Sequence, residues 1–239
     1  MVGESKRRQF LQPCAYCGTL EGKRTDDHVP PSALLLRPYP RRITVRACID
    51  CNNRFSREID QEFALFLTHA IGVSSQEAER FWSEKVMPGL KADRRRLEQF
   101  VTQIQPIFRR AAEGHIEHLG RGVPIRADMV RAMLKRITRG LFYHAYGEVL
   151  SDVPIEADLV RDIDKHIEVF GARGSVITVG DQFGCLHGRT DDDPRASFWI
   201  YQFYNRCFAT VYTGSIAEGE AEASPAVDGE LVLLSPPKG

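Results

Sequence analysis

Three short motifs decide the fold of this chain: C-A-Y-C-G at residues 14–18, T-D-D-H-V-P-P at residues 25–31, and I-T-V-R-A-C-I-D-C-N-N-R-F at residues 43–55. Two Cys-x-x-Cys pairs therefore enclose a single Asp-His step. The two-residue spacing lets one backbone turn present both sulfurs to one ion, and four thiolates can close a tetrahedral zinc site. We predict a structural zinc ion bound by Cys14, Cys17, Cys48 and Cys51. Metal-free or redox-active pairs are the alternatives, but redox motifs usually occur singly beside a helix start.

The polar residues between and after the cysteines have a different chemistry. A lone histidine in a strand is more often structural, but His28 follows Asp27 between the two cysteine pairs, and Asn52 follows the last cysteine. If the zinc holds the first loop against the start of the next helix, Asp27 and Asn52 face each other across a cleft. Carboxylate and amide oxygens suit Mg²⁺ or Mn²⁺. Such an ion stabilises a leaving 3′ oxygen, while a neutral His28 deprotonates a water molecule.

At these motifs the chain resembles the HNH endonuclease family, in the variety whose ββα-metal fold is braced by a four-cysteine zinc. The resemblance covers about residues 12–65 and rests on C-A-Y-C-G, D-D-H-V-P-P and V-R-A-C-I-D-C-N-N. It implies that His28 is the general base, that Asp27 and Asn52 bind a catalytic divalent cation, and that the four cysteines bind the structural zinc. Asn53 is the alternative ligand if the helix starts one residue later.

One departure from the family pattern concerns the loop before the second cysteine pair. The family usually has an asparagine there, which orients the histidine, whereas this chain has Pro40-Arg41-Arg42-Ile43. An arginine cannot accept a hydrogen bond as an amide can. The leading hypothesis is a metal-dependent endonuclease that hydrolyses DNA phosphodiester bonds. The missing asparagine favours the second hypothesis, a non-catalytic zinc module that binds nucleic acid, and a protein-interaction domain with a zinc staple is the third.

The charge distribution supports a polyanionic partner at the front of the chain. The net charge is zero, but residues 1–150 carry 25 Lys or Arg against 17 Asp or Glu, and residues 151–239 carry 7 against 15. Each arginine near the cysteine motifs can be an ordinary solvated side chain. Together they are candidates for phosphate contacts. The candidates for nucleic-acid contact are Arg41, Arg42, Arg46 and Arg54.

The composition is that of an ordinary globular protein, with 43% hydrophobic and 27% charged residues. We expect no membrane span, because no run of eighteen apolar residues exists. The first ten residues lack the apolar core of a signal peptide, so we expect a cytoplasmic protein. Cys185 and Cys207 stand alone in apolar surroundings and are interpreted as small buried side chains.

The sequence pattern predicts an α+β protein in three parts. Residues 1–70 are expected to form the zinc-stapled ββα-metal module, residues 75–150 a helical region, and residues 151–239 an α+β region with a small antiparallel sheet and a frayed tail. Hydrophobic periodicity predicts helices and strands along the chain. Helices are expected from Asn52 or Asn53 to about Ala70, from Ser74 or Ser75, over 91–112 with a kink or break at Pro106, over 126–146 and over 156–170. Strands are expected over 23–29, 43–46, 176–179, 183–186, 198–204 and 207–212.

Overall fold

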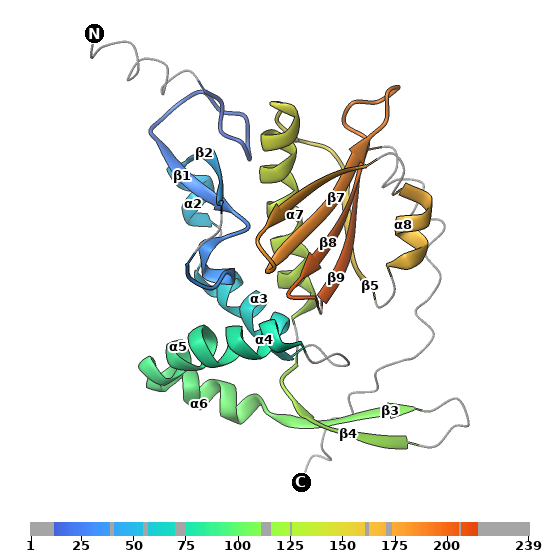
Figure 1. Ribbon diagram of the computed structural model, residues 1–239. Coiled ribbons are helices and arrows are strands. Elements are labelled where there is room, and N and C mark those ends of the chain that lie inside the picture. Colours follow the sequence, from blue (N-terminus) through green and yellow to red (C-terminus); the bar gives the residue numbers. More distant parts are fainter. Residues whose placement is uncertain are drawn as a thin grey trace.

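A computed structural model describes residues 12–38, 41–54, 57–69, 75–110, 116–124, 126–160, 163–170, 174–205 and 207–214. It has mixed α+β architecture with antiparallel sheets, as expected (Figure 1). The frayed tail predicted after Ser215 lies outside these residues. None of the described helices is both long and apolar enough to cross a bilayer.

The cysteine motifs lie on a short antiparallel hairpin and the helix that follows it. Strand β1 (Arg24–Val29) pairs with β2 (Ile43–Cys48), and the helical turn η1 (Ser32–Leu34) lies in the loop between them. Helix α2 (Ile49–Arg54) begins three residues before the expected start, and α3 (Arg57–His69) follows it. The earlier start has a local cause, because Cys48 Sγ accepts the backbone N–H of Cys51 at 3.4 Å and so caps the helix. The predicted order of strand, loop, strand and helix is confirmed.

The central region is less helical than predicted. Helix α4 (Gln76–Phe81), the π-helical turn η2 (Trp82–Val86), α5 (Met87–Ala92) and α6 (Arg94–Gln103) follow one another. The helix predicted over 91–112 is wrong beyond Gln103, because residues 105–110 form strand β3 (Gln105–Arg110), which pairs with β4 (Ile116–Gly122). Pro106 has no backbone N–H to continue the helix and disfavours helical geometry at Gln105. The extended chain then finds its hydrogen bonds across the hairpin.

The longest helix, α7 (Ala127–Tyr146), confirms the predicted helix over 126–146, and Gly147 ends it in the left-handed conformation with φ 71°. The C-terminal sheet contains β5 (Ile155–Val160), β6 (Ser175–Val179), β7 (Phe183–Arg189), β8 (Ser197–Phe203) and β9 (Cys207–Thr213), in the order β5-β9-β8-β7-β6. Helix α8 (Asp164–Phe170) connects β5 to β6. The helix predicted over 156–170 is wrong over its first part, because residues 155–160 pair with β9 along their whole length. Ile155 and Ala157 are buried while Glu156 and Asp158 are exposed, an alternation that suits a strand, and tertiary pairing overrides the helical pattern.

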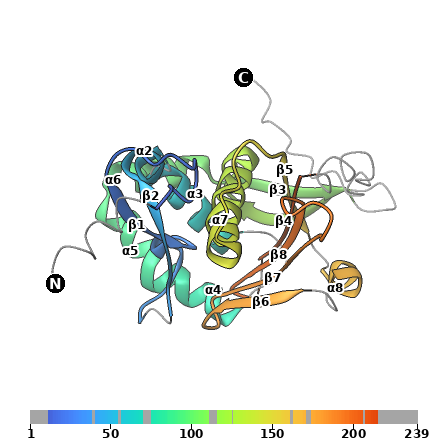
Figure 2. The same cartoon turned by 90° about the horizontal axis from the view of Figure 1, so that it is seen from above.

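Helix α7 is the middle layer of the molecule. Figure 2 shows it between the β1–β2 hairpin on one side and the C-terminal sheet on the other. Trp199 and Tyr201 of β8 pack in the same buried cluster as α7, whereas Phe198 and Ile200 belong to a second cluster on the opposite face of the sheet. The larger cluster includes buried side chains from all three predicted parts of the chain.

The packing of α7 against β1 depends on Gly140. A Cβ atom at this position would lie 2.7 Å from Val29 Cγ2 and 3.3 Å from the Tyr16 hydroxyl, which is closer than side chains normally approach. Glycine therefore permits a helix–strand contact next to Asp27 and His28, although glycine is unfavourable inside a helix.

We predict that Gly140→Ala lowers the free energy of unfolding by about 1–3 kcal/mol, because the new methyl group must displace Val29 or α7. Gly89→Ala is the matched control, since Gly89 also lies in a helix and a Cβ there meets no atom within 4 Å. The control should be neutral or stabilising by up to about 1 kcal/mol. Urea unfolding of both variants measures the difference. Equal stabilisation in both would show that the close approach at Gly140 is not strained by a methyl group.

Candidate functional site

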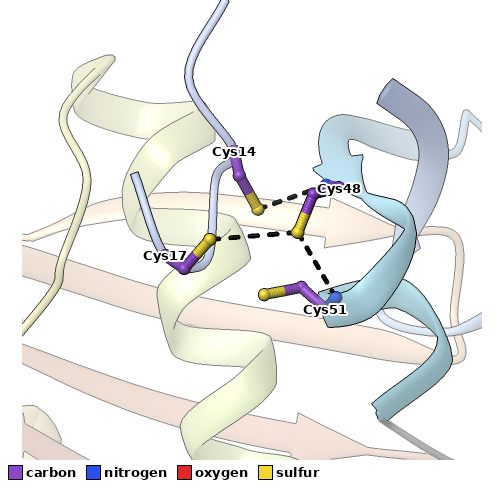
Figure 3. A group of neighbouring side chains, drawn as sticks. All are labelled: Cys14, Cys17, Cys48 and Cys51. Carbon is purple, nitrogen blue, oxygen red and sulfur yellow. Dashed lines mark hydrogen bonds between the residues drawn. The ribbon is translucent and has the colours of Figure 1, made fainter. Parts of the chain in front are cut away.

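The four predicted zinc ligands converge on one point. The sulfur atoms of Cys14, Cys17, Cys48 and Cys51 all lie within 4.8 Å of one another, and Figure 3 shows them directed toward a common centre. The sulfurs of Cys17 and Cys48 are 3.9 Å apart. Four thiolates at about 2.3 Å from a zinc ion stand about 3.8 Å apart, so the cluster has the dimensions of a tetrahedral site. The four cysteines can therefore hold a zinc ion.

Burial and backbone amides act in opposite directions on these thiols. Burial raises the pKa of Cys17 and Cys51, because a thiolate loses hydration in the protein. Burial also acts on Cys14, but backbone hydrogen bonds from Cys48, Cys17 and Tyr16 outweigh it and lower the Cys14 pKa to about 7. Cys14 is thus prepared for ionisation, whereas Cys17 and Cys51 need a positive charge such as a metal ion to become thiolates.

The three predicted catalytic residues line one cavity of about 260 Å³. Asp27 and His28 come from β1, and Asn52 comes from α2. The remaining residues that line the cavity are Asp26, Pro31, Ser32, Ala33, Asp60 and Arg136. The cysteine cluster lies at one end of the same hairpin, because Cys48 ends β2 and Cys51 lies in α2, directly before Asn52.

Asp27 is held by Arg136 and Tyr16, two side chains for which the sequence pattern predicts no role. Arg136 of α7 donates from Nη2 to both carboxylate oxygens, at 3.0 and 2.9 Å. The hydroxyl of Tyr16 donates to Oδ2 at 2.6 Å. Burial and the adjacent Asp27 charge raise the Tyr16 pKa, so the phenol remains a donor. The carboxylate, the guanidinium and the phenol are all buried, so the interaction is little screened by solvent.

A second carboxylate contacts the same guanidinium. Asp60 of α3 accepts from Arg136 Nη1 at 3.2 Å. Burial raises the pKa of Asp60 to about 6, Arg136 partly offsets this increase, and the negative charge of Asp27 adds to it. At neutral pH the inner wall therefore carries two carboxylates and one guanidinium, a formal charge of −1 with His28 neutral. Asp26, at the rim, is paired with Arg46.

The hydrogen bonds of His28 select its tautomer. Arg42 Nη1 lies 3.0 Å from His28 Nε2, and Thr44 Oγ1 lies 3.2 Å from His28 Nδ1. An arginine can only donate, so Nε2 is the unprotonated nitrogen and Nδ1–H donates to Thr44. His28 is therefore neutral in this arrangement, and its basic nitrogen faces the exposed Arg42 side chain.

Asn52 is positioned through β1. Its Nδ2 donates to Thr25 Oγ1 at 3.0 Å, which leaves the amide oxygen as the group available to a ligand in the cavity. Asn53 is exposed and does not line the cavity. The two asparagines thus differ in position, and Asn52 is the one beside Asp27 and His28.

The loop that forms one cavity wall is anchored from distant parts of the chain. Lys85 Nζ donates to the carbonyl oxygens of Ser32 and Leu35, both at 2.6 Å. Gln182 Oε1 accepts the backbone N–H of Leu36 at 2.6 Å, and the Tyr204 hydroxyl donates to the Leu34 carbonyl at 2.7 Å. Hydrogen bonds from η2 and the C-terminal sheet therefore hold this wall.

The predicted phosphate-contacting arginines have different environments. Arg41 and Arg42 are exposed in the segment just before β2, whereas Arg46 is half-buried and pairs with Asp26. Arg54 belongs to α2, but its side chain lies outside the described part of the structure. Of the two exposed arginines, Arg42 is the one that contacts His28.

The sequence predicted no role for Tyr16, Asp60 or Arg136, although Tyr16 lies within the C-A-Y-C-G motif. Arg136 had a recognisable signal, because it is three residues after Met133 and four before Gly140, on the buried side of α7. A charged residue at such a position needs a buried partner. No comparable signal marks Asp60.

Comparisons with models of known families, with curated proteins and with solved structures find no match to this chain. Its function is therefore argued from the geometry of the cavity and the cysteine cluster.

We predict about one zinc ion per chain and its loss in Cys14→Ser and Cys51→Ser, because each serine removes a thiolate ligand. The melting temperature of both variants should fall by about 10 °C or more. Metal analysis of the purified protein and thermal unfolding measure the two effects. Cys207→Ser is the matched control, since this buried cysteine lies outside the cluster. Full zinc content in Cys51→Ser, or equal loss in the control, would contradict the assignment.

We also predict a pH-dependent stability contribution from Asp60. A folded-state pKa of about 6, raised from 3.8, means that the contribution is present below pH 4 and is lost as pH rises through 6. The free energy of unfolding of the wild type, minus that of Asp60→Asn, should fall by about 3 kcal/mol between pH 4 and 7. Urea unfolding of the zinc-loaded proteins across this range measures it. A difference that rises with pH would show that the ion pair with Arg136 outweighs burial.

Proposed function

We propose that this chain is a metal-dependent endonuclease of the HNH type that hydrolyses DNA phosphodiester bonds. One observation supports the proposal most directly: Asp27, His28 and Asn52 line the same cavity, and Asn52 directly follows Cys51 of the four-cysteine cluster. These residue types supply a base and hard oxygen ligands.

The donor set fits a divalent cation such as Mg²⁺ or Mn²⁺. Asp27 offers a carboxylate and Asn52 an amide oxygen, and the inner wall keeps a formal charge of −1 after Arg136 is counted. An excess of negative charge favours a cation in the cavity over an isolated phosphate anion. A divalent cation bound there supplies Lewis-acid stabilisation of the charge that develops on the phosphate and the leaving oxygen.

In the proposed reaction, His28 takes a proton from the attacking water at Nε2. Thr44 holds the ring by accepting from Nδ1–H, so the basic nitrogen keeps a fixed direction. Arg42 occupies that nitrogen in the resting site, and its exposed side chain can turn to a phosphate oxygen when nucleic acid binds. Thr44 thus orients the histidine, which is the role of an asparagine in the family pattern. Arg41 and Arg42 contact the phosphate backbone, which makes binding weaker as salt concentration rises.

Nicking of supercoiled plasmid in Mg²⁺ or Mn²⁺ tests this function. We predict that His28→Ala lowers the nicking rate by at least about 10²-fold, because general-base catalysis contributes that much. His144→Ala is the matched control, since His144 is exposed near the end of α7 and does not line the cavity. The control should retain the wild-type rate, and a metal chelator that spares the zinc should stop nicking.

A non-catalytic nucleic-acid-binding module is the second candidate. The observation that favours it is the ion pair of Asp27 with Arg136, which already engages both carboxylate oxygens. If the wild-type protein binds plasmid but leaves it supercoiled in either metal, this second function replaces the first. If it neither binds nor cuts nucleic acid, a protein-interaction role gains support instead.

A further inference from the structure

We propose that Arg136 neutralises Asp27 when no divalent cation is bound, and that Asp60 is the second carboxylate that holds Arg136. These two side chains would thereby set the affinity of the site for the cation. This inference rests on the proposed function, because it assumes that the cation binds Asp27. Neither residue belongs to the cysteine, Asp-His or asparagine motifs.

The first step in the argument is competition for one carboxylate. Arg136 Nη2 lies within hydrogen-bond distance of both oxygens of Asp27, and Tyr16 also donates to Oδ2. A cation that coordinates Asp27 must share or replace this hydrogen bonding. The guanidinium and the cation then lie on the same carboxylate, and their repulsion opposes binding of the cation.

The second step is that Arg136 cannot leave the cavity. Its side chain is buried, and Thr138, two residues later on α7, shares a 2.7 Å hydrogen bond with Tyr201 of the C-terminal sheet. Gly140 is packed against Val29 on the other side. Because α7 is held between the hairpin and the sheet, the positive charge stays near Asp27 when a cation binds.

The third step is that Asp60 offers the Arg136 guanidinium an alternative partner to Asp27. Asp60 Oδ1 lies 3.2 Å from Arg136 Nη1, on the other branch of the guanidinium fork. As the cation takes the charge of Asp27, the ion pair between Arg136 and Asp27 weakens, and Asp60 retains the guanidinium. Asp60 therefore favours cation binding without contacting the cation, whereas Arg136 opposes it. Both act as positioning residues through Asp27.

Direct binding of Mn²⁺, followed by the loss of the free-ion paramagnetic resonance signal, tests the inference on zinc-loaded protein. Arg136→Gln should tighten Mn²⁺ binding by about tenfold or more, and Asp60→Asn should weaken it by a similar factor. Arg136→Lys keeps the charge and should not tighten binding. A purely structural role would instead weaken binding in both Arg136 variants. Arg131→Gln is the matched control, because Arg131 lies on the same helix but pairs with the exposed Asp158; its affinity should equal that of the wild type.

Thermal unfolding provides a second measurement that needs no activity. Arg136→Gln leaves Asp27 buried without its counter-charge, so Mn²⁺ should raise its melting temperature more than that of the wild type. If this variant does not fold, Asp60→Asn, which keeps the pair between Asp27 and Arg136, still decides: unchanged affinity would overturn the inference.

The outcomes separate this inference from the proposed function. Wild-type protein that binds no Mn²⁺ or Mg²⁺, or binding that persists in Asp27→Asn, would overturn the cation site and with it the proposed function. Binding that is lost in Asp27→Asn but is not tightened by Arg136→Gln would overturn only the role of Arg136 and Asp60.

Discussion

The buried ion pair between Arg136 and Asp27 connects the central helix α7 to the β1–β2 hairpin. Taking a carboxylate and a guanidinium out of water is costly, and the pair is tolerated only because its geometry is close and further hydrogen bonds complete it. Tyr16 and Asp60 supply these bonds. The contact also requires α7 to lie directly against β1, which Gly140 permits. The cysteine hairpin is thus joined to the rest of the chain by charge as well as by apolar packing.

The cysteine cluster solves a different physical problem. The β1–β2 hairpin is two-stranded, and an isolated two-stranded hairpin is only marginally stable in water. A zinc ion bound by four cysteines would fasten the first loop to the start of α2 and thereby fix Asn52 opposite Asp27. The hydrogen bond from the Cys51 amide to Cys48 Sγ already sets the start of that helix. The cysteine cluster and the cavity therefore depend on neighbouring residues, because Cys51 of the cluster directly precedes Asn52 of the cavity.

The cavity has contributions from much more of the chain than the hairpin. Lys85, Gln182 and Tyr204 hold the loop that contains Ser32 and Leu34, and they come from η2 and the C-terminal sheet. Arg136 and Asp60 come from α7 and α3. The sequence outside residues 12–65 thus has a structural role at the candidate site, because it shapes one wall and sets the charge of another.

The features that the sequence alone determines are those with a local physical cause. The two-residue spacing within each cysteine pair, the short strands at 24–29 and 43–48, and the amphipathic helix over 126–146 all follow from patterns within a few residues. The strands at residues 105–110 and 155–160 depend on partners elsewhere in the chain, and for these segments the helical pattern was misleading. Arg136 and Asp27 are 109 positions apart in the sequence, and only the tertiary structure brings them into contact. The reason is that a buried charge acquires its partner when α7 packs on the hairpin, and the residue pattern near either side chain does not encode that distance.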